Sequence, residues 1–360
     1  MDASQDKWKL ARQQSDGLAD RAIASYFEDR PRAEWKAAWQ AVERNGDRNP
    51  SSLPKPFADY LQELEVWPSW ANPALFEEGQ CVFGCYAMEI LSMLGLYSLP
   101  YCYAGADGAK VLYASEQIRT NPGQRLLDTA DFVMAVMDPK GWSPEGKGIR
   151  ALQKVRLLHA SIRYHLLKQG WDSAAHGVPI NQTDMAGTNM AFGWIALRGL
   201  WKLRLSLTRD QMVAYLHTWK VLGYWMGVDE AYLSDDPDVL RKWDEEIATT
   251  QFRASKEGRT LTHALLKYMK QESPIPGFSL LSERIMGNLL GAGVAPMLGL
   301  QAQNMPTGVL PLFFAPLQLA HLPRRDSRKG YHQAKLALAQ QKQRMNQRVT
   351  HAKFEPALKV

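Results

Sequence analysis

Residues 79–98 constrain the fold of this 360-residue chain more than any other stretch. They read Gly-Gln-Cys-Val-Phe-Gly-Cys-Tyr-Ala-Met-Glu-Ile-Leu-Ser-Met-Leu-Gly-Leu-Tyr-Ser and are apolar on nearly every side of a helix. A helix that is apolar all round is buried, because no face of it suits water. We therefore expect this segment at the centre of a helical domain.

Helical periodicity dominates the rest of the chain, and no β-alternation of any length appears. Thr208-Arg209-Asp210-Gln211 has the spacing of a capping box and predicts a helix start. The prolines within 305–323 forbid a long helix there. The pattern predicts an all-α fold, a single helical domain with a C-terminal extension. Candidate helices are 109–118, 122–138, 146–169, 181–203, 208–227, 229–251 and 258–271.

Three segments are expected along the chain. Residues 1–75 form an N-terminal helical extension packed on the core, residues 76–323 form the main helical domain, and residues 324–360 form a basic tail. The N-terminus lacks the apolar region of a signal peptide, and no run of about twenty apolar residues predicts a spanning helix. The expected location is the cytoplasm, with membrane association through the tail as an alternative.

Charge and cysteine content exclude several classes of protein. The net charge is +6, and its excess lies mostly between residues 324 and 353. The remainder is close to balanced, so nucleic-acid binding is not expected; the basic tail is a solvated helix, a frayed terminus or a contact for an anionic membrane. Cys81, Cys85 and Cys102 make no disulfide framework and are interpreted as buried apolar residues. Phosphate-binding loops, dinucleotide fingerprints, zinc-protease motifs and nucleophile elbows are absent from the sequence.

Arg156, His159 and Arg163 share one face of a helix, at spacings of three and four. A histidine between two cations suits a metal that carries its own anionic groups. Haem is such a group, since imidazole binds iron and guanidinium binds propionates. The alternative is a surface stripe of two arginines beside a histidine that is already satisfied.

Three further segments carry polar residues in apolar surroundings. Arg125 and Thr129 lie four apart on one helical face, where the threonine hydroxyl bonds its own helix or a ligand; the alternative is a surface pair of Arg125 with Asp128. In the segment 177–188, Asn181 or Thr183 caps the following helix. His217 lies inside an apolar helix and is either a core residue or a ligand.

Together these blocks resemble the family of latex clearing proteins, or rubber oxygenases, and fungal MpaB oxygenases. The resemblance runs from about Ala114 to Val228 and keeps the order of the family. Its blocks are Ser115 with Arg125-x-x-x-Thr129, Arg156-x-x-His159-x-x-x-Arg163, Pro179-Ile180-Asn181-Gln182, and Ala214-Tyr215-Leu216-His217-x-Trp219.

The resemblance implies a globin-like arrangement of helices round haem b. It implies that His159 is the proximal iron ligand, that Arg156 and Arg163 bond the propionates or fix the helix, and that His217 also belongs to the cofactor site. Arg125 and Thr129 would be the catalytic pair on the distal side. The implied activity is cleavage or oxygenation, by dioxygen, of a C=C bond in an apolar isoprenoid-like or lipid substrate.

Two positions depart from the latex clearing proteins. Their lysine before the threonine is replaced by Asp128, and their catalytic glutamate has no counterpart, because Lys110 lies near its place with Asp107 and Glu116 nearby. These differences leave two other functions open. One is a haem protein with a peroxidase-like, dehydrogenating or oxygen-sensing role. The other is a haem-free helical module on membranes, which the apolar stretch 285–319 and the basic tail favour.

Overall fold

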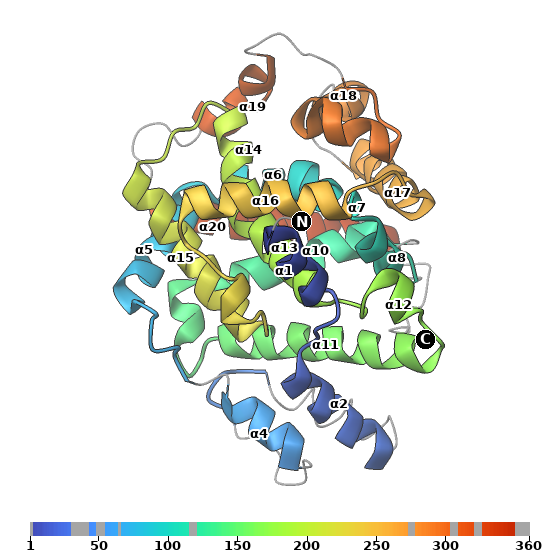
Figure 1. The fold of residues 1–360 in the computed structure, drawn as a ribbon. Helices are drawn as coiled ribbons and strands as arrows, with labels where there is room; N and C mark the ends of the chain where they lie inside the picture. The colour runs from blue at the N-terminus through green and yellow to red at the C-terminus, as the bar shows by residue number, and fades with distance from the viewer. Residues whose placement is uncertain are drawn as a thin grey trace. The chain divides into compact units, whose positions relative to one another are not determined.

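Helices build the whole of the described structure (Figure 1). It is a computed structural model that describes residues 3–29, 43–47, 55–63, 66–114, 121–272, 278–302, 309–319 and 326–349. Within these ranges the β contacts amount to one isolated bridge between Gly105 and Phe252. The expected all-α class is therefore confirmed.

The helices follow one another with short connections. Those up to residue 168 are α1 (Ala3–Ala11), α2 (Gly17–Asp29), α4 (Lys55–Glu63), α5 (Pro73–Cys85), α6 (Ala87–Met93), η1 (Leu94–Ser98), α7 (Leu99–Tyr103), α8 (Ala106–Ala114), α10 (Pro122–Val136), η2 (Pro139–Trp142) and α11 (Gly148–Lys168). Those after residue 168 are α12 (Ser173–His176), α13 (Gln182–Met190), η3 (Ala191–Ile195), α14 (Ala196–Lys202), α15 (Arg209–Trp225), η4 (Glu230–Tyr232), α16 (Pro237–Gln251), α17 (Lys256–Glu272), α18 (Phe278–Val294), η5 (Ala295–Leu298), α19 (Val309–Leu319) and α20 (Ser327–Val349).

The chain forms two compact units whose segments alternate along the sequence. The first consists of Met1–Gln80, Phe132–Asn189 and Val213–Leu240. The second consists of Cys81–Asp131, Met190–Met212 and Arg241–Val360. The expected divisions after residues 75 and 323 stay a prediction.

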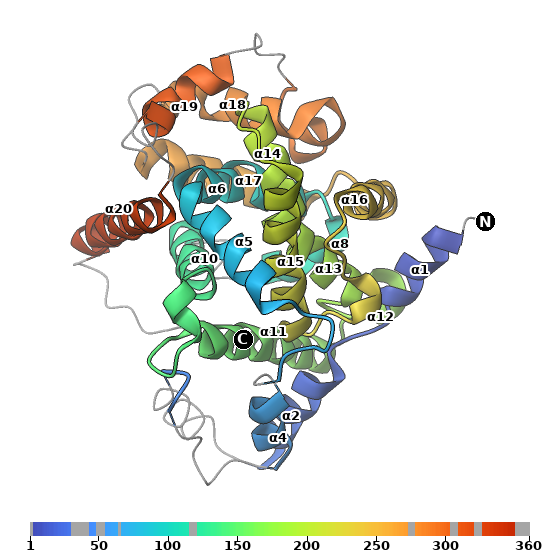
Figure 2. The same cartoon turned by 90° about the vertical axis from the view of Figure 1, so that its left-hand side faces the viewer.

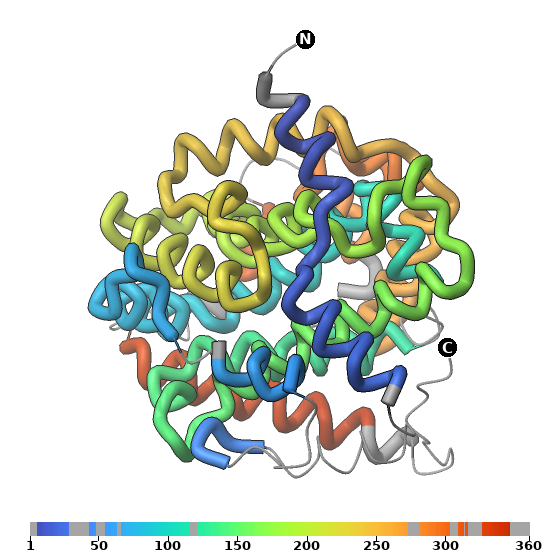
Figure 3. The backbone as a smooth tube through the Cα atoms, turned by 60° about the horizontal axis from the view of Figure 1, so that its bottom comes forward, coloured from blue at the N-terminus to red at the C-terminus, as the bar shows by residue number. Residues whose placement is uncertain are grey.

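In the first unit, α2 packs along both α11 and α4 (Figures 1 and 2). Tyr26 and Phe57 are buried there, with ring centroids 5.9 Å apart. The Tyr60 hydroxyl donates to the carbonyl of Gln153 at 2.9 Å, and the Gln153 amide donates to the carbonyl of Leu61 at 2.9 Å. Figure 3 follows the N-terminal segment, in blue, from α1 into α2. This segment shares a core with α11.

Four aromatic side chains form a second cluster in the first unit. Trp142 stacks on Trp225 with centroids 4.9 Å apart, Phe76 meets Trp142 edge-on at 5.1 Å, and Trp67 meets Trp225 edge-on at 4.8 Å. Such pairs add stability beyond the area they bury. The cluster fixes the C-terminal end of α15, from which the chain turns at Gly227.

In the second unit, the π-helices η1 and η3 contact each other, and α14 packs on α6. A Cβ on Gly199 would lie 2.7 Å from Cγ of Met93, so glycine permits this close approach. Arg198 of α14 forms an ion pair with Asp244. The other Asp244 oxygen accepts from the Tyr101 hydroxyl at 2.7 Å, and burial raises the pKa of this aspartate.

The described part of the basic tail is the helix α20, which packs on α6 in the second unit. Ala334 and Leu338 are buried on one side of it, whereas Lys329 and Lys335 are exposed. A Cβ on Gly330 would lie 2.1 Å from a backbone oxygen of α5, so the two helices meet at this glycine. The tail is therefore an amphipathic helix over these residues.

Several expectations from sequence can be compared with the helices. The capping box is confirmed, because Gln211 N–H donates to the Thr208 hydroxyl at 3.2 Å and Thr208 N–H donates to the Gln211 side chain at 3.0 Å. The segment 79–98 is largely buried as expected. It is not one straight helix, since the chain bends between α5 and α6 at Tyr86, whose φ is −124°.

Prolines 311 and 316 nevertheless occur within a helix, α19, which is eleven residues long. Pro311 falls in its first turn, where helix N–H groups have no partner in the helix, so its missing N–H costs little there. No single described helix is long and apolar enough to cross a membrane. The bent pair Pro73–Cys85 and Ala87–Tyr103, with 83° between its helices, passes that test on length and composition.

Candidate functional site

The helix α11 (Gly148–Lys168) carries all three residues of the Arg-His-Arg pattern. Its interior is free of proline and glycine and rich in leucine, alanine, lysine and arginine, which favour a helix. At its start the side-chain oxygen of Asn45 accepts the N–H of Ile149 at 3.1 Å. At its end the chain leaves through Gly170, whose φ is +84°. Local sequence therefore accounts for where α11 begins and ends.

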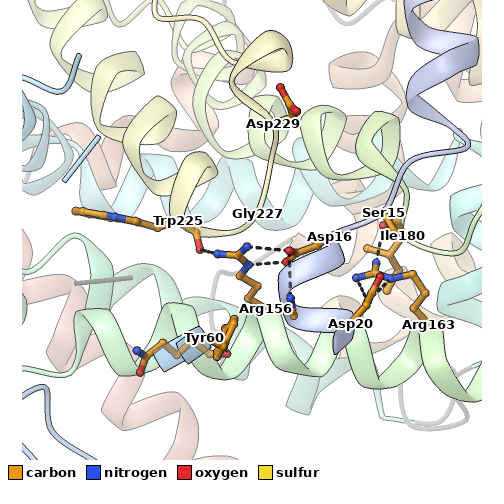
Figure 4. A network of polar contacts seen from close by, with 12 residues as sticks. Ser15, Asp16, Asp20, Tyr60, Arg156, Arg163, Ile180, Trp225, Gly227 and Asp229 are labelled. Atoms are coloured by element: carbon orange, nitrogen blue, oxygen red, sulfur yellow. Dashed lines mark hydrogen bonds and ion pairs between the residues drawn. The ribbon is translucent and has the colours of Figure 1, made fainter. Parts of the chain in front are cut away.

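Arg156 is buried and binds Asp16, which lies directly before α2 (Figure 4). Its Nε donates to one carboxylate oxygen at 2.5 Å and its Nη2 donates to the other at 2.8 Å. Nη1 donates to the carbonyl of Trp225 at 3.3 Å, and the guanidinium lies 5.5 Å from the centre of the Tyr60 ring. The two-pronged contact is the strong form of this ion pair.

Arg163, one side-chain repeat further along α11, is equally buried and binds Asp20 of α2 (Figure 4). Its Nε donates to an Asp20 carboxylate oxygen at 2.7 Å. Its Nη1 donates to the carbonyl of Ile180 at 2.8 Å. Ile180 has a φ of +52°, which is costly for a β-branched residue. Arg163 thus helps to hold a strained turn.

That turn begins the segment 177–188. Asn181 caps α13, because its side-chain oxygen accepts the N–H of Asp184 at 3.0 Å; the expectation of a cap at Asn181 or Thr183 is confirmed for Asn181. The Gln182 amide donates to the carbonyl of Gly227 at 3.0 Å, and its oxygen accepts the N–H of Asp229 at 2.9 Å. The segment therefore joins the turn after α15 to the environment of Arg156.

Gly227 allows this turn to approach the Arg156–Asp16 ion pair. Its φ is +86°, and a Cβ there would lie 2.3 Å from Oδ2 of Asp16 and 2.8 Å from Nε of Arg156. Both the backbone conformation and the space exclude a side chain.

His159 lies between the two arginines, about one turn from each. Its side chain is half-buried, and its Nδ1 atom is buried. The described residues contain no group of three histidine, cysteine or acidic side chains suited to a metal ion, so the donor here is a single imidazole.

His217 is buried, and the protein uses both of its ring nitrogens. Nδ1 lies 2.7 Å from Oδ2 of Asp235, and Nε2 accepts the N–H of Asn72 at 3.0 Å. Lys220 also binds Asp235, at 3.3 Å. The hydrogen bond from His217 lowers the pKa of Asp235 to about 2. His217 was expected to bind a cofactor, but no ring nitrogen is left for one in this arrangement.

The predicted catalytic pair, Arg125 and Thr129, lies on α10 within the second unit. The Thr129 hydroxyl donates to the carbonyl of Arg125 at 2.8 Å, which is the bond to its own helix. Arg125 is half-buried and forms no surface pair with Asp128, because exposed Asp128 accepts from Gln124 at 2.7 Å. The interpretation of Arg125 as part of a surface ion pair is therefore wrong.

The surroundings of Arg125 in the second unit include a fully buried phenol, Tyr103. Burial raises the pKa of Tyr103, and the nearby charge of Arg125 opposes that rise. Asp107, one of the acids considered for the missing glutamate, is buried and pairs with Arg253 at 2.6 Å. Glu116 lies outside the described residues. Lys110 is half-buried on α8.

These residues fit haem at the iron and differ from expectation at the propionates. A half-buried imidazole on a well-held helix is the donor that haem iron takes from a protein. Both neighbouring guanidinium groups, by contrast, already bind carboxylates and carbonyls of the chain. Of the two roles considered for Arg156 and Arg163, their contacts support the fixing of the helix.

Sequence reasoning missed Asp16, Asp20 and Asp235, the three carboxylates that bind these cations and His217. One pattern pointed to the first two: Asp16 and Asp20 are four apart beside Ala19 and Ile23, both fully buried. Acids on the apolar side of a helix need a buried partner.

Comparison with known proteins agrees with this arrangement. The chain is 25% identical over 227 residues to the rubber oxygenase of Streptomyces sp. (strain K30), and the match covers 62% of this chain and 55% of that protein. The chain thus spans little more than half the length of this relative. A structure of latex clearing protein in the closed state shares the fold, with a TM-score of 0.74, 22% identity, and coverage of 89% of this chain and 91% of that one.

Residues 84–315 match the family model described as ER-bound oxygenase mpaB/B'/rubber oxygenase, catalytic domain. The matched region includes the Arg125–Thr129 and Arg156–Arg163 blocks and most of the helices described above. This chain belongs to the family of MpaB and rubber oxygenase catalytic domains.

Proposed function

We propose that this chain is a haem b-dependent oxygenase that cleaves or oxygenates a C=C bond of an apolar substrate. The observation that carries the proposal is the half-buried imidazole of His159 on a helix held by two buried ion pairs, in a chain of this family. The substrate class rests on the name of the relative, rubber oxygenase, and is an isoprenoid-like chain or an unsaturated lipid.

His159 would hold the cofactor through one ring nitrogen. When bound, haem supplies the oxidising chemistry that side chains lack, and the chain supplies the ligand, the polarity and the access. Ion pairs on α11 keep the imidazole in place. The overall reaction balances without a reductant, because one C=C bond and one dioxygen molecule give two carbonyl groups.

Arg125 is proposed to act on the polar side of the reaction. It is half-buried, and its guanidinium carries no hydrogen bond or ion pair among the described residues. A cation in that position can donate to an oxygen atom on which negative charge develops. Thr129 would offer its hydroxyl as an acceptor, since its proton is given to the carbonyl of Arg125.

An absorption spectrum tests the proposal directly. Protein produced with ample haem should show a Soret band, and His159→Ala should lose it, whereas the half-buried His165 on the same helix provides a matched His165→Ala control. Oxygen uptake should follow addition of an unsaturated terpenoid or lipid, with carbonyl products that carry both atoms of ¹⁸O₂. A haem-free protein after such expression would refute the proposal.

A second candidate, a haem protein with another redox role, is favoured by Asp128. This residue stands where latex clearing proteins carry a lysine, and it is exposed and bound to Gln124. An acid there changes the charge near Arg125. If the haem-loaded protein consumes hydrogen peroxide with a phenolic donor and takes up no dioxygen with unsaturated substrates, this second candidate holds and oxygenation fails.

A further inference from the structure

We infer that Asp16 and Asp20 are positioning residues that set the register of α11 and, through it, the place of the His159 imidazole. The part that concerns haem rests on the function proposed above. The part that concerns α11 rests on contacts within the first unit alone (Figure 4).

The two ion pairs hold α11 at two points, one on each side of His159. Arg156 precedes the histidine by three residues and Arg163 follows it by four. Seven residues of α-helix span about 10 Å. A helix held at one point can pivot or slide, whereas two anchors at that separation fix both its axial position and its rotation.

Both anchors are buried enough to be costly to disturb. The side chains of Arg156 and Asp16 are 8% and 4% exposed, and those of Arg163 and Asp20 are 2% and 30% exposed. A buried charge that loses its partner must be hydrated, and the helix has to move to let water in. Loss of either aspartate should therefore shift or loosen α11.

The anchors are themselves held by neighbouring turns. Gln182 donates to the carbonyls of both Ser15 and Gly227, at 3.3 and 3.0 Å, so it ties the chain before α2 to the turn after α15. Asp16 also accepts the N–H of Ala19 at 3.4 Å, in the first turn of α2. The carboxylate of Asp16 is thus placed by two segments before it binds Arg156.

Asp16 and Asp20 lie outside residues 84–315, the part of the chain that matches the family model. The N-terminal segment would therefore complete the ligand helix from outside the matched domain. This assigns to residues 16–20 a role in the cofactor site, although neither aspartate touches His159 in any described contact.

The test compares Asp16→Asn and Asp20→Asn with a matched control, Asp6→Asn. Asp6 belongs to the same N-terminal segment, is 62% exposed and pairs with Lys9 at 3.7 Å. Hydrogen exchange of the full chain reports on the amides of residues 156–166. We expect exchange to accelerate about a hundredfold or more in Asp16→Asn, and less in the half-buried Asp20→Asn, with no change in Asp6→Asn.

A double variant separates positioning from stability. Asp16→Asn with Arg156→Met removes both charges, so it should regain most of the lost thermal stability. If Asp16 positions the imidazole, the haem-loaded double variant should still show a displaced Soret maximum or a lower haem-to-protein ratio. Recovery of stability, Soret maximum and haem ratio together would overturn the positioning role.

Exchange in α11 that is unchanged in both single variants would also overturn the inference. Should Asp16→Asn fail to fold, Asp20→Asn and the double variant still decide the matter. Failure of the proposed function gives a different result: a wild-type chain that binds no haem, with α11 exchange still dependent on Asp16. In that case the anchor of α11 stands and the haem assignment falls.

Discussion

Replacement of Gly227 by alanine should destabilise the first unit more than any other glycine-to-alanine change at a positive φ within it. The new Cβ would lie 2.3 Å from Oδ2 of Asp16 and 2.8 Å from Nε of Arg156. Neither atom can retreat far, because both belong to a buried ion pair. Gly170→Ala is the matched control, since Gly170 has a similar φ, +84°, and no atom within 4 Å of its Cβ position.

The magnitude follows from two separate costs. A non-glycine residue at such a φ costs about 1–3 kcal/mol, and this cost is common to both variants. Loss of the ion pair adds about 3–5 kcal/mol in Gly227→Ala alone. The change in unfolded-chain entropy is the same for both and cancels in the difference. We therefore expect Gly227→Ala to be about 3 kcal/mol or more less stable than Gly170→Ala.

Chemical denaturation followed by tryptophan fluorescence measures this difference, because Trp225 lies beside the ion pair. Thermal midpoints should differ by roughly 5 °C or more. Equal stability of the two variants would show that the turn at Gly227 relaxes without disturbing Asp16 and Arg156. The argument from close approach would then be wrong.

Three further predictions concern other parts of the chain. The His217 hydrogen bond lowers the pKa of Asp235 from 3.8 to about 2, so its stabilisation is full above pH 4 and is lost as the pH falls toward 2; Asp235→Asn should remove on the order of 1–2 kcal/mol of that acid dependence in unfolding titrations. Gly330→Ala should destabilise the second unit by about 1–3 kcal/mol in urea, because its Cβ meets a backbone oxygen at 2.1 Å, whereas Gly293→Ala, with open space, should not. Arg125→Met should keep the Soret band and lower substrate-dependent oxygen uptake about tenfold or more; loss of haem instead would make Arg125 a structural residue.

Local patterns in the sequence predicted the helices well. The capping box at Thr208 and Gln211 forms both of its hydrogen bonds, because all its atoms belong to one turn of chain. Prolines misled only in part: they kept α19 short, but one of them occupies a first turn where its missing N–H does no harm.

Partners far apart in the sequence could not be predicted in the same way. The spacing of Arg156 and Arg163 showed a shared face but not what that face meets. Their carboxylate partners lie 140 and 143 residues away. Both a haem propionate and an aspartate satisfy the same guanidinium geometry, so spacing alone cannot distinguish them. His217 shows the same limit, since Asp235 and the N–H of Asn72 reach its ring from separate loops.

The π-helix η3 (Ala191–Ile195) makes the phase of the following helix sensitive to chain length. A π-turn holds one residue more than an α-turn, and each residue of an α-helix advances the next by about 100°. Deletion of one residue within η3 would turn α14 by that angle. Arg198 would leave Asp244, and Gly199 would leave Met93. A relative that lacks one codon here would present a different face of α14 to its core, although every other residue were identical.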